Sequence, residues 1–331
     1  MSKENRQKVW NYRIIAYLCT KEIVMRMITG YSKQILTAVV LFLTVFATAQ
    51  TVSNPAQPTA QTVAKNLGEQ KYAITVGDVV MTIDGGGGGK ILSLKYKDNE
   101  VINQSRWPES FGSTFWTSPQ KEWNWPPVPE LDKRPYTINQ ESPTLVMTSE
   151  VSEKLKYKVR KEFATDTKNG AFVITYSITN EADETRSVAP WEITRVPNAG
   201  VIFFDAPVEG ITPAGLMDFK AEHGVAWYTA DEAPQNRKVN ADGKGWLAYA
   251  NNGLLLVKAF QDLEASQPAP GEAEIQVYMN RGKTYIELES QGAYTALKPG
   301  ETLSWTVKWF LVPCADTGAA LIDKVKKLVK R

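Results

Sequence analysis

The sequence predicts an all-β protein, built as one large antiparallel sandwich or barrel with a short C-terminal helix. A dozen segments alternate apolar and polar residues or are rich in β-branched and aromatic residues. Glycine, proline or asparagine separates many of these segments, as tight hairpins require. Only one stretch, near the C terminus, has helical periodicity. So many short strands in one domain indicate a two-sheet or closed architecture.

The predicted strands follow one another from residue 72 to residue 311. They cover 72–76, 79–83, 91–96, 144–149, 154–163, 171–180, 200–204, 245–250, 254–260, 273–280, 284–291 and 302–311. Tight turns are predicted at 168–170, 251–253, 280–282 and 298–300. We therefore assign residues 71–313 to a single β domain.

The last segment, 314–331, is predicted to be helical. Its apolar residues recur on one helical face, Asp316 or Thr317 is available as a cap, and basic residues occupy the last turn. The apolar face consists of Leu321, Ile322, Val325, Leu328 and Val329. We interpret the segment as a helix that packs on the β domain; association of its lysines with a membrane surface is the alternative.

Residues 1–49 have the form of a leader with a secretory signal. An apolar run of 15 residues, 35–49, follows two basic residues and ends in Ala47-Thr48-Ala49, which predicts cleavage before Gln50. A membrane anchor needs about 20 apolar residues, so we expect no membrane span after cleavage. Met25 or Met27 would start a signal of ordinary length. The sequence thus predicts a periplasmic or secreted protein, with residues 50–70 as a flexible linker rich in Pro, Gln, Thr and Ala.

The charge balance argues against a nucleic-acid partner. The chain has 38 Lys and Arg against 36 Asp and Glu, and the leader contains 7 of the former and 2 of the latter. The remainder, 31 against 34, is close to neutral, whereas nucleic-acid binding needs a basic surface. Cys314 is the only cysteine after the leader, so the stability of the domain must come from its core.

Four tryptophans and five prolines crowd the segment 107–129. Proline fixes φ and removes backbone donors, so the sequence predicts a stiff loop with aromatic faces. Indole rings held in this way suit the C–H faces of pyranose rings. The alternative is that the loop packs over the core. The tryptophans are Trp107, Trp116, Trp123 and Trp125.

Cofactor and metal sites have little support in the sequence. The glycine run 85–89 lacks the Lys and hydroxyl residues of a phosphate loop and precedes a strand, so we interpret it as a flexible hairpin connection. His223 is the sole histidine and there are no paired cysteines, so we predict no zinc site and no cofactor. An oxygen-ligated calcium site is compatible with the sequence.

Catalytic chemistry would therefore come from carboxylates. Glu287 and Glu289 are two residues apart in a predicted strand, so both should point to one face, together with Gln291. Trp191, Glu192 and Arg195 similarly combine a ring, a carboxylate and a cation. A solvated polar face is the alternative for both groups.

Three segments resemble aldose 1-epimerases (galactose mutarotases). Residues 288–291 (LESQ), followed by 297–301 (LKPGE), are similar to the family's strand with a Leu-Glu-x-Gln pattern and its Pro-Gly-Glu turn. Residues 176–180 with 190–192 resemble the asparagine turn and the strand that bears the family's acid histidine, and 89–94 resembles its first hairpin. The likeness covers about 71–313 and looks stronger still to uncharacterised secreted mutarotase-like domains of polysaccharide-degrading bacteria.

This resemblance implies a galactose mutarotase-like β-supersandwich with a carbohydrate groove, and gives Glu289 the position of the catalytic base. Mutarotation also needs an acid for the ring oxygen. The chain departs from the family here, because Trp191 or Glu192 stands where the acid histidine is expected. Glu192 would act as the acid if burial raised its pKa; otherwise His223 would have to serve.

The expected ligand of this protein is a mono- or oligosaccharide, and three functions are compatible with the sequence. The first is an isomerase that interconverts sugar anomers or epimers with Glu289 as base. The second is a non-catalytic carbohydrate-binding domain, and the third is a glycosidase or lyase with Glu192 and Glu289 as a carboxyl pair. The isomerase with Glu192 as acid and the glycosidase or lyase both use Glu192 and Glu289, so both require these two glutamates on one face of the sheet. The expected sugar-binding residues are Trp116, Trp123, Trp125, Trp191, Arg195, Glu287 and Gln291.

Overall fold

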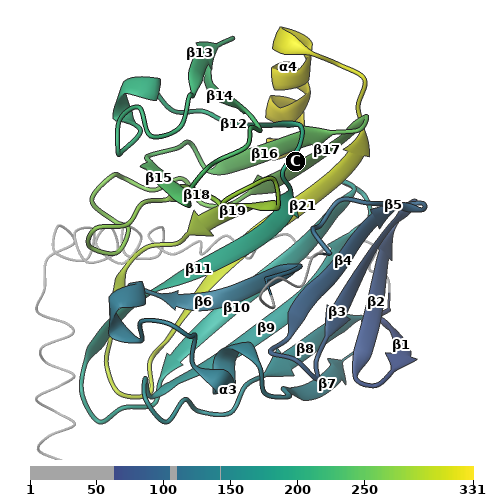
Figure 1. Cartoon of the computed structure of the whole chain (residues 1–331). Helices are drawn as coiled ribbons and strands as arrows, with labels where there is room; N and C mark the ends of the chain where they lie inside the picture. Colours follow the sequence, from purple (N-terminus) through teal and green to yellow (C-terminus); the bar gives the residue numbers. More distant parts are fainter. Residues whose placement is uncertain (1–62, 105–109, 142) are drawn as a thin grey trace, which may run out of the picture. The chain divides into compact units, whose positions relative to one another are not determined.

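The computed structural model describes residues 63–331 except 105–109 and 142, and these residues form two antiparallel β-sheets (Figure 1). The expected leader, 1–49, and most of the expected linker, 50–70, lie outside the described residues. The described end of the linker range contains a short strand, β1 (Lys65–Gly68), which pairs with β2 (Lys71–Val76). No helix in the described part of the chain is long and apolar enough to cross a membrane.

The first sheet has 11 strands, and its main path runs β1-β2-β3-β4-β6-β11-β19-β18-β15. The short strands β5 and β20 pair with β4 and β11 at its sides. Besides β1 and β2, the strands are β3 (Val79–Asp84), β4 (Lys90–Tyr96), β5 (Asn99–Glu100), β6 (Ser113–Ser118), β11 (Arg186–Pro197), β15 (Arg237–Ala241), β18 (Ile275–Met279), β19 (Tyr285–Gln291) and β20 (Thr295–Leu297).

The second sheet has 10 strands in the order β13-β14-β12-β16-β17-β21-β10-β9-β8-β7. Its strands are β7 (Thr137–Glu141), β8 (Thr144–Thr148), β9 (Tyr157–Asp166), β10 (Ala171–Asn180), β12 (Val201–Phe204), β13 (Lys220–Glu222), β14 (Val225–Thr229), β16 (Trp246–Asn251), β17 (Leu254–Ala259) and β21 (Thr302–Pro313). Short helical turns are η1 (Gln120–Glu122), α3 (Pro129–Asp132) and η2 (Val208–Gly210).

The main core lies between the two sheets. Strands such as β9 bury every second residue, because alternate side chains of a strand point to opposite faces. Tyr176 of β10 stacks on Phe115 of β6 with ring centroids 4.2 Å apart, which joins the two sheets directly. This architecture confirms the predicted all-β class.

The C-terminal helix, α4 (Gly318–Val329), covers a second apolar cluster on the other face of the second sheet. Leu321, Val325 and Leu328 pack there with Phe203 and Phe310. In Figure 1 the helix lies beside β16 and β17. All six residues of β17 are buried, since this strand has the core on one side and the helix on the other. The predicted packing helix is confirmed.

The glycine run 85–89 connects β3 to β4, as predicted, but it is packed tightly and is not a loose connection. The buried Lys161 donates hydrogen bonds to the carbonyl oxygens of Gly88 (2.7 Å) and Gly89 (3.2 Å). A Cβ on Gly88, whose φ is +73°, would lie 2.2 Å from the carbonyl oxygen of Asp132. Glycine is therefore required by a close approach of two backbones.

Candidate active site on the outer face of the first sheet

One face of the first sheet gathers polar and aromatic residues from neighbouring strands. In the pairing of β11 with β19, Trp191 lies opposite Gln291 and Arg195 lies opposite Glu287, with Glu289 between them along β19. Paired residues of antiparallel strands point to the same side, so these five side chains share a face. It is the face turned away from the second sheet.

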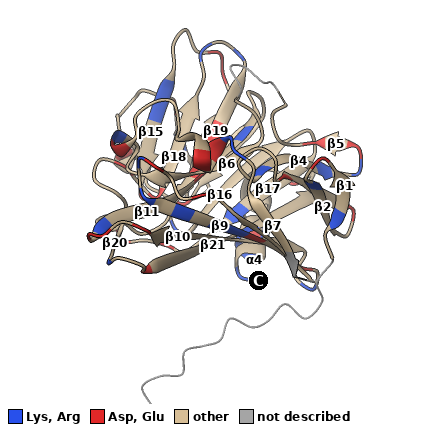
Figure 2. Ribbon diagram, turned by 90° about the horizontal axis from the view of Figure 1, so that it is seen from below, with Lys and Arg blue, Asp and Glu red and all other residues tan. Residues whose placement is uncertain are grey.

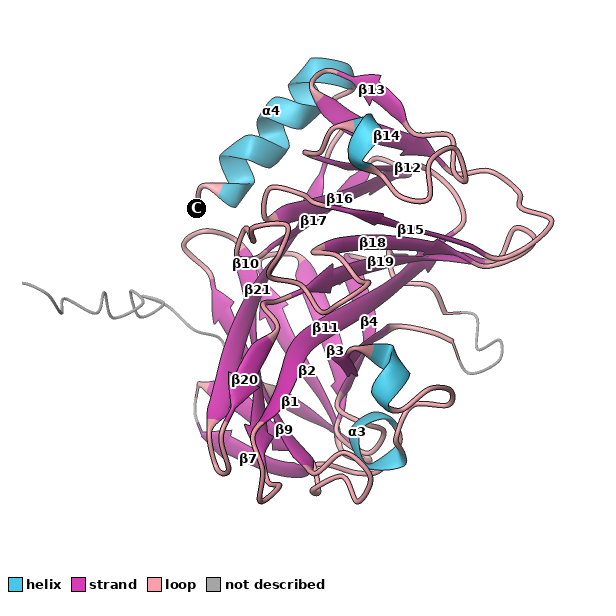
Figure 3. Cartoon of the chain, turned by 90° about the vertical axis from the view of Figure 1, so that its left-hand side faces the viewer, coloured by secondary structure: helices cyan, strands magenta, loops and turns pink. Residues whose placement is uncertain are grey.

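The flanking strands extend this face. Trp116 of β6 lies opposite Trp191, Tyr278 of β18 lies opposite Glu287, and Lys238 of β15 lies opposite Tyr278. Figure 3 shows β11, β19, β18 and β15 as successive strands. Figure 2 shows the basic residues of β15 in blue and the acidic residues of β19 in red.

A cavity of about 500 Å³ opens on this face, and we call it the Glu289 cavity. Its volume lies in the range of small-molecule sites. The aromatic part of its lining consists of Trp116, Trp125, Trp191, Tyr278 and Tyr285. The charged part consists of Lys238, Arg281, Glu287 and Glu289. Ser110, Gln120, Asn236 and Asn280 complete the lining. Such a combination of flat rings and hydrogen-bonding groups suits a polar ring compound.

Glu289 is buried, with 1% of its surface exposed, and its two oxygens differ. Oε2 accepts hydrogen bonds from Trp191 Nε1 (2.9 Å) and from Lys238 Nζ (2.8 Å). Oε1 is also buried but has no hydrogen-bond partner among the described residues. Burial raises the pKa of the Glu289 carboxyl above its usual value, although the charge of Lys238 opposes this shift. One carboxylate oxygen of this cavity-lining residue therefore has its hydrogen-bonding capacity unused among the described residues.

Glu287, which lines the cavity, is paired with Arg195, which lies behind the lining. Arg195 Nε donates to Glu287 Oε1 at 2.8 Å, and the guanidinium carbon lies 5.6 Å from the centre of the Trp116 ring. Arg195 was predicted to bind sugar directly, but it is only 3% exposed and does not line the cavity. Its observed contacts are those of a support for Glu287 and Trp116.

The tryptophan segment is less uniform than the sequence predicts. Trp116 does not belong to a loop, because it lies on β6 in the middle of the first sheet. Asp132 of α3 accepts its Nε1 hydrogen at 2.8 Å. Burial would raise the pKa of Asp132, but Lys90 and the bonds from Trp116 and Thr114 outweigh it, and that pKa lies below its usual value. The Trp116 ring is thus locked in place by a carboxylate.

The other tryptophans differ in exposure. Trp123 is buried, and its Nε1 donates to the carbonyl oxygen of Thr117, so it anchors the loop and does not line the cavity. Trp125 is 63% exposed and packs edge-on against Trp116, with ring centroids 6.0 Å apart. Trp107 lies outside the described residues. Trp116 and Trp125 therefore reach the face that carries Glu289.

Glu192 lies on the opposite face of the first sheet, which corrects its predicted role as catalytic acid. It is fully buried between the sheets, where Lys258 Nζ lies 2.8 Å from Oε2 and Tyr176 Oη donates to Oε1 at 2.6 Å. Glu192 precedes Ile193, which lies opposite Glu289, so alternation along β11 turns it inward. The glycosidase and lyase mechanisms with Glu192 and Glu289 as a pair are therefore wrong.

His223 also lies apart from the cavity. It occupies the exposed turn between β13 and β14 at the edge of the second sheet, with φ of +52°. A Cβ placed on Gly318 of α4 would lie 3.0 Å from its Nε2, so the ring packs near the C-terminal helix. The predicted use of His223 as an acid for Glu289 is wrong.

Gln291 is buried and serves the framework. Its Oε1 accepts from the Ala269 backbone at 2.8 Å, and its Nε2 donates to Ser118 Oγ (3.0 Å) and Glu272 Oε2 (2.7 Å). Glu272 Oε1 in turn accepts from the backbone of Gln120, in the loop that leads to Trp125. Gln291 was predicted to bind sugar, yet its hydrogen-bonding groups are occupied and it ties β19 to the tryptophan loop.

Sequence reasoning missed Lys238, Tyr278, Asn236 and Arg281. A signal for Tyr278 was present, because 273–280 was predicted as a strand in which Gln276 and Tyr278 alternate with apolar residues. Lys238 lies on β15, which was not predicted as a strand at all. Its place beside Glu289 depends on how β15 pairs with β18, and no local pattern specifies that pairing.

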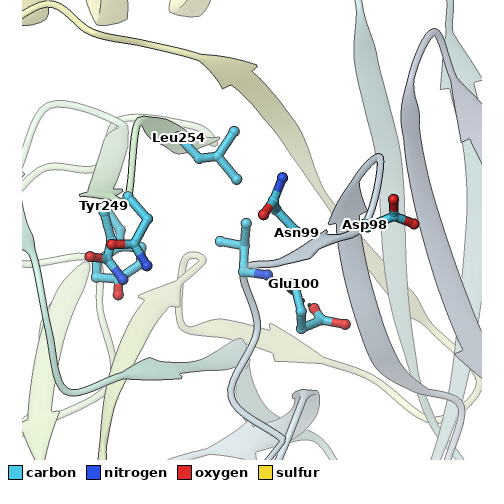
Figure 4. Close-up of a pocket in the computed structure, with 8 residues that line it drawn as sticks. Asp98, Asn99, Glu100, Tyr249 and Leu254 are labelled. Atoms are coloured by element: carbon cyan, nitrogen blue, oxygen red, sulfur yellow. Dashed lines mark hydrogen bonds between the residues drawn. The ribbon is translucent and has the colours of Figure 1, made fainter.

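A second cavity, of about 180 Å³, offers less chemistry. Figure 4 shows it between Tyr249 and Leu254 on one side and Asn99 and Glu100 on the other. Glu100 is already occupied: Oε1 accepts from the backbone of residues 94, 101 and 102, and Oε2 accepts from a nearby serine hydroxyl. In the described part of the chain, no group of three or more His, Cys, Asp or Glu side chains is placed to hold a metal ion.

Comparison with known proteins identifies the fold. The sequence matches no known family in a scan and no curated protein in a search. Solved structures do match. A protein from Klebsiella pneumoniae assigned as an aldose 1-epimerase has a TM-score of 0.56 and 13% identity, over 82% of this chain and 86% of that one.

Two further structures agree. A protein from Escherichia coli K12, also assigned as an aldose 1-epimerase, has a TM-score of 0.54 and 12% identity, over 77% of this chain and all of that one. A galactose mutarotase-like protein from Lactobacillus casei has a TM-score of 0.53 and 14% identity, over 73% of this chain and all of that one. This chain therefore has the galactose mutarotase-like fold, as its sequence resemblance implied.

Proposed function

We propose that this protein binds a sugar ring in the Glu289 cavity and interconverts the anomers of that sugar. The observation that carries the proposal is the state of Glu289: one carboxylate oxygen is held by Trp191 and Lys238, and the other is desolvated and unpartnered among the described residues, on the wall of a tryptophan-lined cavity. The fold shared with the mutarotase-like structures supports the same function.

The chemistry needs a base and an acid on one side of the sugar. Glu289 Oε1 takes the proton of the anomeric hydroxyl, the bond between the anomeric carbon and the ring oxygen breaks, and an acid protonates that oxygen. After rotation the reverse steps close the ring as the other anomer. Lys238 is the acid in this proposal, because its ammonium group lies 2.8 Å from Glu289 on the same wall. Lys238 thus has the role of catalytic acid that the sequence predicted for Glu192 or His223.

The rings position the sugar. Trp125 offers an exposed face at the cavity mouth, while Trp116 and Trp191 are held edge-on to each other, with centroids 5.5 Å apart. Aromatic faces bind the apolar face of a pyranose and leave its hydroxyls free for hydrogen bonds. Asn236, Asn280 and Tyr278 supply such groups around the wall.

A binding-only role is the second candidate, and one observation favours it. The chain has a single histidine, which lies on the exposed β13–β14 turn away from the cavity. If Lys238 serves only to neutralise Glu289, the site would hold sugar without catalysing ring opening.

Polarimetry separates the two roles. Freshly dissolved α-anomers of common hexoses should mutarotate faster with the wild-type protein, and Glu289→Gln should lower that acceleration by about 100-fold or more. His223→Ala, the control outside the cavity, should leave the rate unchanged. Equal rates for wild type and Glu289→Gln would eliminate the catalytic role, and sugar binding by both would then support the binding-only role.

We also propose that the protein acts outside the cytoplasm. The support is the signal-like sequence of residues 35–49, which lies outside the described residues.

A further inference from the structure

One cation in the lining of the Glu289 cavity has no ion-pair partner among the described residues. Glu289 is paired with Lys238, and Glu287 is paired with Arg195, at 2.8 Å in each case. Arg281 also lines the cavity, and its guanidinium has no carboxylate partner among the described residues. Among the charged side chains that line the cavity, Arg281 is therefore the one without a partner of opposite charge in the described part of the chain.

The backbone at Arg281 is held by its neighbours. It follows Asn280 in the turn between β18 and β19, and its backbone N–H donates to Asn236 Oδ1 at 2.9 Å. Asn280 Nδ2 bonds to Thr284 Oγ1 at 2.8 Å across the same turn. These bonds hold the backbone of the turn. Arg281 therefore enters the cavity lining from the end of β18, whereas Trp116 and Trp125 belong to the β6 side.

We propose that the preferred ligand of the Glu289 cavity is a saccharide unit with a single carboxylate, as in a uronic acid, and that Arg281 recognises this group. The planar guanidinium matches the geometry of a carboxylate with two parallel hydrogen bonds. A sugar ring against the tryptophans on the β6 side directs a carboxylate substituent toward Arg281 on the other side. A phosphate at neutral pH has close to two negative charges, which exceeds the single unpaired cation, so the charge balance favours a carboxylate.

This inference rests on the proposed sugar site but makes a separate claim about selectivity. The chain provides a matched control, because Lys283 is an exposed cation two residues from Arg281 that does not line the cavity. Lys283→Gln removes the same charge from the same turn without touching the site.

The test is calorimetric titration with matched sugars: glucose, glucuronate and glucose 6-phosphate, and galactose with galacturonate. In wild type we expect the uronate to bind at least about 10-fold more tightly than its neutral parent, with the difference shrinking at high salt. Arg281→Gln should remove most of that difference, because it should weaken binding of the uronate much more than binding of the neutral sugar. Lys283→Gln should change neither affinity.

Three results would overturn the inference. They are equal affinity of wild type for uronates and neutral hexoses, tighter binding of the sugar phosphate, and equal effects of Arg281→Gln and Lys283→Gln. Failure of this inference is distinct from failure of the proposed function. If neutral hexoses bind and Trp125→Ala weakens them, the sugar site stands and only the selectivity is wrong. If no sugar of either class binds, both fall.

Discussion

Lys238 and Glu289 form a salt bridge of 2.8 Å although a whole strand, β18, separates β15 from β19. The lysine reaches across this strand over the ring of Trp191, whose centre lies 4.6 Å from Nζ. Trp191 donates to the same carboxylate oxygen. Cation, ring and carboxylate thus hold one another in place, and this arrangement leaves Glu289 Oε1 without a hydrogen-bond partner among the described residues.

Removing Lys238 should shift the pH dependence of activity. The positive charge of Lys238 holds the pKa of Glu289 down against burial, so in Lys238→Met that pKa rises further. A base must be deprotonated, so the acidic limb of the pH–rate profile should move to higher pH, and the maximal rate should fall because the acid is lost. Polarimetric rates between pH 4 and 9 measure both effects.

Lys283→Gln is the control for this profile, because it removes a lysine outside the cavity. An unchanged acidic limb in Lys238→Met would show that the salt bridge does not control the protonation of Glu289.

Trp125→Ala should weaken sugar binding by about 5-fold without changing stability. Loss of one aromatic contact is worth about 1 kcal/mol, and a side chain that is 63% exposed contributes little to folding. Calorimetric titration with a test sugar that binds the wild-type protein measures the affinity, and thermal unfolding measures the stability. Trp227→Phe, on the second sheet, is the aromatic control. Unchanged affinity in Trp125→Ala would remove the exposed ring from the site.

The ion pair of Glu192 with Lys258 should matter for stability and not for sugar chemistry. Both side chains are fully buried, and burial lowers the pKa of Lys258 while the carboxylate opposes this shift. Lys258→Met alone leaves a buried carboxylate unpaired and should cost about 3–5 kcal/mol in the free energy of unfolding. The double variant Glu192→Leu with Lys258→Met should recover most of this loss.

Urea unfolding at pH 7 measures both variants. A loss below about 1 kcal/mol in Lys258→Met would mean that the pair is not coupled as the structure shows.

Lys161 should make stability depend on pH between about 7 and 10. Burial lowers the pKa of Lys161 to about 7, whereas the unfolded chain has the ordinary lysine value of about 10.4. Between these values the unfolded state binds the extra proton, so the folded state gains stability as pH rises and loses it as pH falls toward 7. In Lys161→Met this dependence is absent. The difference in unfolding free energy between wild type and variant should therefore grow in favour of wild type from pH 7 to pH 10; a constant difference would contradict the shift.

Export can be checked on the protein itself. Expressed with its full leader in a Gram-negative host, the mature protein should be recovered from the periplasm or medium with Gln50 at its N terminus. N-terminal sequencing reads this directly, and Ala49→Lys should block the cleavage, because the site requires a small residue there. An uncleaved cytoplasmic product would contradict the prediction.

Strand prediction succeeded where alternation or a run of β-branched and aromatic residues lies next to a turn signal. β9 alternates over all ten of its residues and is joined to β10 by a turn that contains Gly170, so the hairpin follows from local pattern. β6 was missed because it lies within 107–129, where the prolines and tryptophans predicted a loop. β15 was missed because its five residues include two basic ones and few apolar ones.

By itself, the sequence determined the all-β class, the C-terminal helix and the common face of Glu287 and Glu289, because each depends on residues near one another in the chain. Tertiary structure decided which side chains meet across strands: it turned Glu192 inward to Lys258, left His223 on a distant turn, and brought Lys238 to Glu289. The physical reason is that strand pairing joins segments far apart in sequence, and a shift of one residue exchanges the two faces of a strand.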